Sequence, residues 1–489
     1  MTHTRPRPPA DRHLTRGLAA NPGLSIDVLR PLADSDDEQT RQALARRTDL
    51  TEDLAVRLAT GPPVGRSATQ AAGPPARPAT VQAAIPPARP AAAQAAVPPV
   101  RLAAAQAVVL AGNPVAAAHA WPQLITHPDP SARRALAAHA PSPALRILAH
   151  DPDLGVRRAV AVRPDLPGDL VLQLAADPSP IVRREIAWHP HRPHTLLTDR
   201  DDQVRRSALM RVAPPDDLLP ALLADPATRP VAARHVHDPG RAAALRDDPD
   251  PWVRSSLAEN DHLPYRVVSP LGTDGDEEVR TAIMLRRDTP DDVRHTIAAT
   301  LTDQDTHVSD WLRPQRATRA ERLAHLRSPF VFHRRAIAFS TDLPAEAVAA
   351  LAADDDYSVR LLTARNSPGV PGHILPGLLR RAGHDRWELA AHPNMPAASL
   401  AALATGDDEE LRQVAAAAPN LPPRLAAALL TDRHHQTRCN AAANPALPLP
   451  LLRQALHGPD RDLARHAARN PALPVPDAQK IITAHGTVR

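Results

Sequence analysis

The sequence predicts an all-α, right-handed superhelix, a solenoid built from two-helix repeats of about 26 residues. The first observation is an arginine that returns every 26 residues, at Arg334, Arg360, Arg386, Arg412 and Arg438. The second is a proline with the same period, at Pro396, Pro422, Pro448 and Pro474. A unit this short cannot bury its own apolar face, so neighbouring units must stack and share a continuous core.

The composition indicates what that core contains. The chain has 489 residues, of which 43% are apolar but only 2% are aromatic. The core must therefore consist of Ala, Leu, Val and Ile, which suits thin and closely packed helices. Because each unit of a solenoid contacts only its neighbours, we expect one long, curved body.

Charge and cysteine content bear on the cellular setting. Lys480 is the only lysine, so almost no group titrates between histidine and arginine. A formal net charge of only +4 is therefore enough to give a pI near 10.0, and this pI does not by itself indicate nucleic-acid binding. The single cysteine, Cys439, excludes an intramolecular disulfide framework. We find no secretory signal and no stretch apolar enough for a membrane span, so we expect a cytoplasmic protein without a membrane partner.

One clear copy shows how each repeat is built. Asp165-Leu-Pro167 precedes a predicted helix over 169–176, and Asp177-Pro178 precedes a second helix over 181–188. Proline fits the first turn of a helix, and a neighbouring aspartate caps the free amides there. Each helix carries one narrow apolar stripe of residues four apart, namely Leu170 and Leu174, then Val182 and Ile186.

The same segments carry a family resemblance. Leu174-Ala-Ala-Asp-Pro178 with Val182-Arg183, and Arg438 through Asn444-Pro-Ala-Leu-Pro448, resemble the repeat of the leucine-rich repeat variant family. The resemblance covers 16–58 and 113–475, with degraded copies near 214–241 and 303–327. It implies an α-solenoid of alternating α and short 3₁₀-like helices, related in shape to HEAT and armadillo arrays. The iron–sulfur cluster known from the family needs an N-terminal set of cysteines that this chain lacks, so we expect no cofactor.

The period divides the chain into segments. We expect a disordered basic tail at 1–15, N-terminal repeats at 16–60, a main solenoid at 113–480 and a tail at 481–489. Within 61–112 the period falls to 12 residues, with proline pairs such as Pro62-Pro63 and Pro74-Pro75. We favour very short Ala-rich helices that continue the stack in compressed form; the alternative is a proline-stiffened linker.

The repeated arginines are the first candidates for function. Equivalent positions line up along a solenoid, so the arginines would form a row able to bind phosphate or an acidic partner. The alternative, which we favour, is that each pairs with an acid just before it, as Arg360 could with Asp356.

Doubled arginines add a second charge about 100° further round each helix, so one of each pair could face outward. Trp188 belongs to a residue type favoured at binding hot spots, although filling a gap between units is the simpler role. The candidate binding patch is Arg133, Arg134, Arg157, Arg158, Arg183, Arg184, Arg205, Arg206 and Trp188.

No catalytic or metal-binding constellation emerges from the sequence. It has no Gly-rich loop followed by Lys-Ser/Thr, no Gly-x-Ser-x-Gly and no His-Glu-x-x-His. His435 and Cys439 lie four residues apart on one helical face, but two ligands do not make a metal site. We therefore expect no catalytic, cofactor-binding or metal-binding residues.

These observations predict a non-enzymatic, monomeric scaffold that binds a macromolecular partner, in the first place a protein, on the solenoid surface. The alternative is a nucleic-acid-binding protein that uses the arginine-rich patch in a HEAT-like groove, as HEAT-like DNA glycosylases do.

Overall fold

The structure, a computed structural model, describes residues 12–60, 104–210, 213–302 and 307–485. Every regular element within these ranges is a helix, and two layers of helices alternate along the chain. The predicted all-α repeat architecture is confirmed. The handedness of the superhelix stays a prediction.

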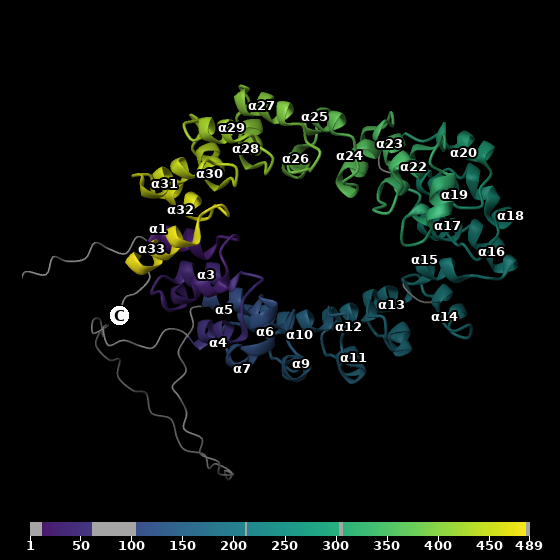
Figure 1. Cartoon of the computed structure of the whole chain (residues 1–489). Coiled ribbons are helices and arrows are strands. Elements are labelled where there is room, and N and C mark those ends of the chain that lie inside the picture. Colours follow the sequence, from purple (N-terminus) through teal and green to yellow (C-terminus); the bar gives the residue numbers. More distant parts are fainter. Residues whose placement is uncertain (1–11, 61–103, 211–212, 303–306, 486–489) are drawn as a thin grey trace, which may run out of the picture.

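One layer is formed by the second helices of the repeats. Figure 1 shows that helices of this inner layer, such as α10 (Leu154–Ala161), α12 (Pro180–Ala187) and α13 (Asp202–Leu209), lie nearer the middle of the molecule than the other layer. That layer includes α9 (Ser142–Leu148), α11 (Gly168–Ala175) and α14 (Leu219–Ala224). The members of the inner layer are α1 (Arg12–Ala19), α3 (Glu38–Ala45), α5 (Ala104–Ala111), α8 (Pro130–Ala137), α10 (Leu154–Ala161), α12 (Pro180–Ala187), α13 (Asp202–Leu209), α15 (Arg229–Ala232), α17 (Pro251–Ala258), α19 (Glu277–Leu285), α22 (Val331–Ala338), α24 (Tyr357–Asn366), α26 (Arg386–Ala390), α28 (Glu409–Ala417), α30 (His435–Ala443) and α32 (Arg461–Ala468).

The outer layer contains the first helices of the repeats, some of them short or of 3₁₀ type. Its members are α2 (Ile26–Leu29) with η1 (Arg30–Asp34), α4 (Glu52–Thr60), α6 (Pro114–His119) with α7 (Trp121–Leu124), α9 (Ser142–Leu148), α11 (Gly168–Ala175), η2 (His194–Thr198), α14 (Leu219–Ala224), α16 (Pro239–Arg246), α18 (Tyr265–Val268) with η4 (Ser269–Thr273), α20 (Asp291–Ala298), α21 (Arg319–Ala324), α23 (Ala345–Ala352), η6 (Gly372–Ile374) with α25 (Leu375–Leu379), α27 (Ala397–Thr405), α29 (Pro423–Leu429), α31 (Leu449–His457) and α33 (Val475–His485).

Local sequence signals start the inner helices. Asp153 caps α10 by accepting a 3.0 Å hydrogen bond from the backbone N–H of Val156, and Asp129 caps α8 in the same way through Ser131 at 2.8 Å. Proline occupies the first turn of α8, α12 and α17, where its missing N–H costs no hydrogen bond. Each short helix therefore begins at a position set by its own residues.

The core lies between the two layers and is aliphatic. Val182 and Ile186 of α12 are fully buried, and Leu170 and Leu174 of α11 are almost so, which confirms the apolar stripes predicted for this repeat. Helices of eight residues would be marginal on their own, so their stability comes from packing against the next repeat.

The stack of inner helices closes on itself. Successive inner helices pack on each other from α1 to α19 and again from α22 to α32, and α32 then packs against α1. Figure 1 shows the resulting ring, in which the first and last described helices lie side by side. The expected long, curved body is therefore closed into a ring, because the curvature accumulated over the repeats brings the last unit back to the first.

Asparagines at equivalent positions make the same contact between neighbouring repeats, and we call this contact the joint. Asn444 Nδ2 donates to the carbonyl oxygens of Ala416 and Ala418 in the preceding repeat, both at 2.8 Å. Asn470 makes the same pair of bonds to the repeat before it. The asparagine amide thus ties each of these inner helices to the preceding repeat. It also gives a partner to backbone carbonyl oxygens that would otherwise be buried without one.

The described helices on either side of 61–103 are in direct contact. Helix α5 packs on α3, and Asn113 Nδ2 donates at 2.7 Å to the carbonyl oxygens of both Ala45 and Arg47. This is the joint seen between neighbouring repeats elsewhere. The residues of the 12-residue period up to 103 lie outside the described part of the chain, and α5, at the end of the predicted 61–112 segment, belongs to the stack.

The repeats are irregular where the resemblance is degraded. Helix α15 has only four residues and is extended by η3 (Ala233–His235). Between α19 and α22, the 3₁₀ turn η5 (Asp310–Leu312) contacts α22 where a full inner helix would be expected. Another 3₁₀ turn, η7 (Gly383–Asp385), precedes the short α26.

Candidate interaction surface on the inner layer

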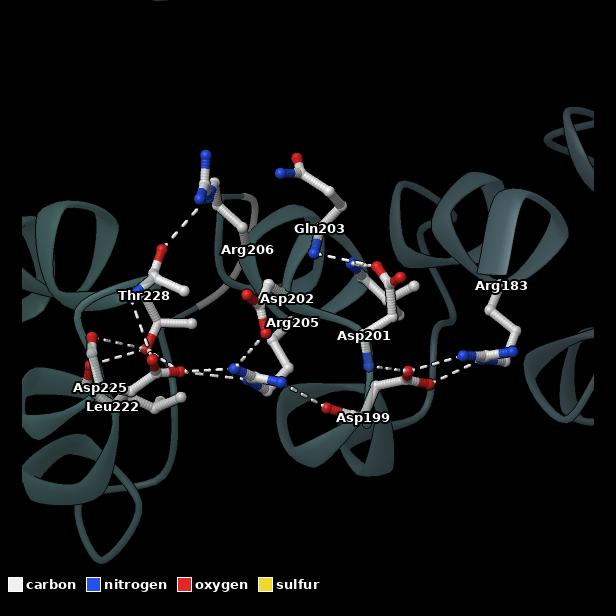
Figure 2. Close-up of polar contacts among 12 residues, drawn as sticks. Arg183, Asp199, Asp201, Asp202, Gln203, Arg205, Arg206, Leu222, Asp225 and Thr228 are labelled. Atoms are coloured by element: carbon white, nitrogen blue, oxygen red, sulfur yellow. Dashed lines mark hydrogen bonds and ion pairs between the residues drawn. The ribbon is translucent and has the colours of Figure 1, made fainter. Parts of the chain in front are cut away.

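The first arginine of each doublet joins two repeats. Arg183 Nε and Nη2 donate to the two carboxylate oxygens of Asp199 at 2.8 Å each, and Nη1 donates to the carbonyl oxygen of Asp177 at 2.9 Å. Asp199 belongs to the following repeat and Asp177 to the loop before α12. Figure 2 shows this bridge in line with the next one, between Arg205 and Asp225.

The bridge recurs around much of the ring. In each case an arginine of an inner helix pairs with an aspartate that lies one to three residues after the outer helix of the next repeat. These pairs are Arg133–Asp151, Arg157–Asp177, Arg183–Asp199, Arg205–Asp225, Arg229–Asp248, Arg254–Asp274, Arg334–Asp354 and Arg412–Asp432.

The bridges hold their carboxylates ionised. The hydrogen bond from the guanidinium lowers the pKa of Asp199, and the equivalent bonds lower the pKa of Asp225 and Asp274. A further ion pair joins Arg16 of α1 to Asp37, the residue that caps α3. Burial would raise the pKa of Asp37, but hydrogen bonds from Arg16 and Thr40 outweigh it and lower the pKa to about 2. These ion pairs belong to the structure of the repeat joints.

The partner expected from the sequence was the wrong one. Arg360 does not pair with Asp356; its Nη1 donates to the carbonyl oxygens of Asp354 and Asp355. Asp356 instead caps α24 through the N–H of Val359 and accepts from Arg335 of the preceding repeat at 2.8 Å. Spacing along one helix suggested the i,i+4 pair, whereas stacking offers a bidentate partner about 20 residues further on.

This arrangement divides the predicted patch into two sets. Arg133, Arg157, Arg183 and Arg205 are held in the bridges. Their neighbours Arg134, Arg158, Arg184 and Arg206 lie one residue further round each helix and are not part of the bridges. Only this second set remains available to a ligand.

The second arginines differ in how far they are engaged. Arg134 is exposed and Arg184 is half-buried, and neither has an ion pair with a described residue. Arg158 pairs with Glu185 at 2.8 Å while remaining 54% exposed. Arg206 donates from Nε to the carbonyl oxygen of Ala227 and lies 5.3 Å from the ring of Trp252. Figure 2 shows Arg206 on the side of α13 away from the line of bridges.

Exposed apolar side chains flank these arginines. Val162, Trp188 and Met210 follow Arg158, Arg184 and Arg206 by four residues, so each lies on the same helical face as its arginine. Val162 is 59% exposed, and Leu154 and Ile181 near the starts of α10 and α12 are also exposed. The inner strip is defined here as Leu154, Arg158, Val162, Ile181, Arg184, Trp188, Arg206 and Met210.

Sequence reasoning found the arginines and Trp188 but missed the other apolar members. Val162 and Met210 follow the last residue of a helix whose own apolar stripe is already buried. A signal was present, because one large apolar residue recurs at the same repeat position in three successive units. Only burial shows that these side chains face solvent instead of the core.

The remaining candidates do not form a site. Cys439 is buried 3.8 Å from the ring nitrogens of His435, and burial raises the pKa of its thiol to about 11. Within the described ranges, no three His, Cys, Asp or Glu side chains are grouped so that they could hold a metal ion. None of the helices in the described part of the chain is long and apolar enough to cross a membrane.

The comparisons with known proteins point to the repeat family and no further. The family model of the leucine rich repeat variant matches residues 154–179, which contain α10 and α11. No curated protein matches the chain. The matched residues include three members of the inner strip, Leu154, Arg158 and Val162.

Proposed function

We propose that the protein is a non-enzymatic scaffold that holds a protein partner along the inner strip of α10, α12 and α13. The observation that carries the proposal is the repetition of one exposed apolar residue and one arginine, four residues apart, in three successive repeats. A helical repeat array commonly binds partners on an extended surface of this kind.

The chemistry of the strip defines the partner. Trp and Arg are enriched at binding hot spots, and a guanidinium pairs best with a carboxylate through two parallel hydrogen bonds. Glu185 and Asp202, the acids on these helices, are already paired with Arg158 and Arg205. The strip therefore favours a segment that carries acidic and apolar side chains in alternation and lies across the three helices.

The closed ring supports a monomeric scaffold. An open solenoid needs capping repeats that cover the apolar faces of its ends. Here α1 and α32 cover each other, so neither end is left to recruit a second copy. We extend the proposal to a monomer in the cytoplasm; light scattering of the purified chain and fractionation of native cells test these two points.

A pair of matched variants tests the proposal. The inner variant carries Val162→Ser, Trp188→Ser and Met210→Ser. The outer control carries Ile147→Ser and Leu172→Ser, which replace apolar residues that are 54% and 62% exposed on α9 and α11. Affinity capture from native cells with quantitative mass spectrometry should recover a partner with the wild type and the outer control but not with the inner variant.

A recovered partner must then bind the purified ring directly, and Arg184→Glu should weaken that binding through repulsion of its acidic segment. A partner retained equally by all three proteins would contradict the proposed surface. Recovery of no partner above background would contradict the scaffold itself.

The second candidate is nucleic-acid binding, and Arg134 and Arg184 are the observation that favours it, because neither has an ion pair with a described residue. Phosphate contacts give a steep fall of log affinity against log salt concentration. A salt titration with duplex DNA should therefore show a slope that Arg134→Gln and Arg184→Gln each reduce by about one. A flat response excludes this candidate.

A further inference from the structure

A hollow lies where the two ends of the chain meet. It has a volume of about 460 Å³ and is bounded by α32, α1 and α3. Its lining includes Arg465, His466 and Arg469 from the last repeats, and Arg16, Gln42 and Arg46 from the first. A second hollow of about 520 Å³ shares Ala20, Arg46 and Arg469 with the first.

Small residues in and just after α1, the helix between α32 and α3, leave this space open. Arg469, Ala20 and Arg46 directly follow α32, α1 and α3 and so occupy the same repeat position, one residue before Asn470, Asn21 and Arg47. Ala20 between two arginines leaves a gap that a longer side chain would fill. Gly17, which also lines the hollow, has no room for a side chain, because an added Cβ would lie 2.7 Å from the Cβ of Ala468.

The hollow is strongly positive. Arg46 and Arg469 are exposed and have no ion pair with a described residue, and no carboxylate lines the first hollow. Arg16 is bound to Asp37, and Arg465 lies 3.3 Å from the exposed Asp462. The only acid that lines the second hollow, Asp49, is held by Arg47 at 2.7 Å. The guanidinium groups of Arg46 and Arg469 thus line both hollows without an ion pair to a described residue.

Two of the lining arginines also act on His466, which is partly buried beside them. Burial lowers the pKa of His466, and the charges of Arg465 and Arg469 lower it further because they oppose a third positive charge. The same repulsion acts between the two chain ends, since Arg469 belongs to one and Arg46 to the other. An anion in the hollow would remove that repulsion and contact both ends at once.

Phosphate groups suit this lining best. Arginine binds phosphate through two parallel hydrogen bonds, and Gln42, whose Nε2 also donates to Glu38 at 2.9 Å, adds a neutral donor through its second N–H. The volume of about 460 Å³ is larger than one phosphate group occupies. No aromatic ring other than that of His466 lines the hollow to stack a nucleobase, so recognition would rest on the phosphates.

We propose that the hollow binds a polyvalent phosphate anion, either a chain of inorganic phosphates or the triphosphate of a nucleotide, and that the bound anion fastens the ring. This site is separate from the inner strip on α10, α12 and α13. Its ligand acts on the shape of the scaffold and not on the partner's contact surface.

Calorimetric titration of the full chain with inorganic triphosphate at constant ionic strength tests the proposal. We expect saturable binding of one triphosphate per chain, at least tenfold weaker in Arg46→Gln and in Arg469→Gln. Arg134→Gln is the matched control, because Arg134 is also an exposed inner-layer arginine that has no ion pair with a described residue, and it should bind as the wild type does. Circular dichroism and thermal unfolding verify that each variant folds.

Two further measurements locate the site and identify the source of the phosphates. Gly17→Ala, which disturbs the joint without removing a charge, should also weaken binding. A clear preference for ATP over triphosphate would identify the triphosphate of a nucleotide as the ligand, whereas equal affinity or a preference for triphosphate would identify the inorganic phosphate chain. The proposal is overturned if triphosphate does not saturate at millimolar concentration, or if Arg134→Gln weakens binding as much as Arg46→Gln and Arg469→Gln do.

Discussion

The side-chain amide of Asn21 donates a 2.7 Å hydrogen bond to the carbonyl oxygen of Asn470, although 449 residues separate them along the chain. The same amide donates to Ala468 at 2.9 Å. Asn470 itself makes the equivalent bonds to Ala442 and Asn444 at 2.9 and 2.7 Å. The joint that closes the ring therefore copies the joint between consecutive repeats.

Asn21→Ala should open the ring without unfolding it. The substitution leaves two buried carbonyl oxygens without a donor, which costs about 1–3 kcal/mol, and only the closing joint is affected. Small-angle X-ray scattering should show a larger radius of gyration, with unchanged helix content by circular dichroism. Asn444→Ala is the control, because it breaks an internal joint that chain connectivity still holds. An unchanged radius in Asn21→Ala would show that this bond does not maintain closure.

Gly17→Ala should open the ring through a steric clash. The new methyl group would meet the carbonyl oxygen of Arg465 and lie 2.7 Å from Ala468 Cβ, and overpacking of this kind costs about 1–3 kcal/mol. Gly168→Ala is the control, because no atom lies within 4 Å of its added Cβ. Scattering and thermal unfolding should change for the first variant only. A compact Gly17→Ala protein with wild-type stability would contradict the close approach of α1 and α32.

Arg183→Ala should destabilise the stack far more than Arg184→Ala. Arg183 and Asp199 are 5% and 10% exposed, and removing one partner of a buried ion pair costs about 3–5 kcal/mol because a charge is left unpaired. The adjacent Arg184 has no ion pair with a described residue, so its loss should change stability by about 0.5 kcal/mol or less. Urea unfolding of the two variants measures the difference. Equal midpoints would contradict a structural role for the bridges.

Acid should weaken the ring between about pH 4 and pH 2. The folded state lowers the pKa of Asp37 to about 2 and also lowers the pKa of Asp199, Asp225 and Asp274. A lowered carboxylate pKa stabilises the folded state above the unfolded pKa, and this contribution is lost as the pH falls through the folded pKa. Asp37 alone should contribute about 1–2 kcal/mol.

Urea midpoints at pH 5, 4 and 3 check the acid prediction. They should fall with pH, and Asp37→Asn should show a smaller fall than the wild type because it lacks one of the titrating groups. Midpoints that stay constant down to pH 3 would contradict it.

Several features of the fold follow from local sequence alone. The 26-residue period of the arginines, the proline and aspartate at helix starts, and stripes such as Val182 and Ile186 fixed the repeat and its buried face. These features depend on residues within one repeat, which is why the sequence shows them. The pairing of Arg183 with Asp199 needed the stacking geometry, since the two residues lie on different repeats.

What the sequence by itself determined is the repeating unit: two short helices, their caps and the apolar stripe that each must bury. Only the tertiary structure decided that the units form a ring, that Asn21 reaches Asn470, and that Val162 faces solvent while Val160 is buried. The reason is physical. Closure depends on small rotations between neighbouring repeats that add up over the whole chain, and no residue within a single repeat encodes that sum.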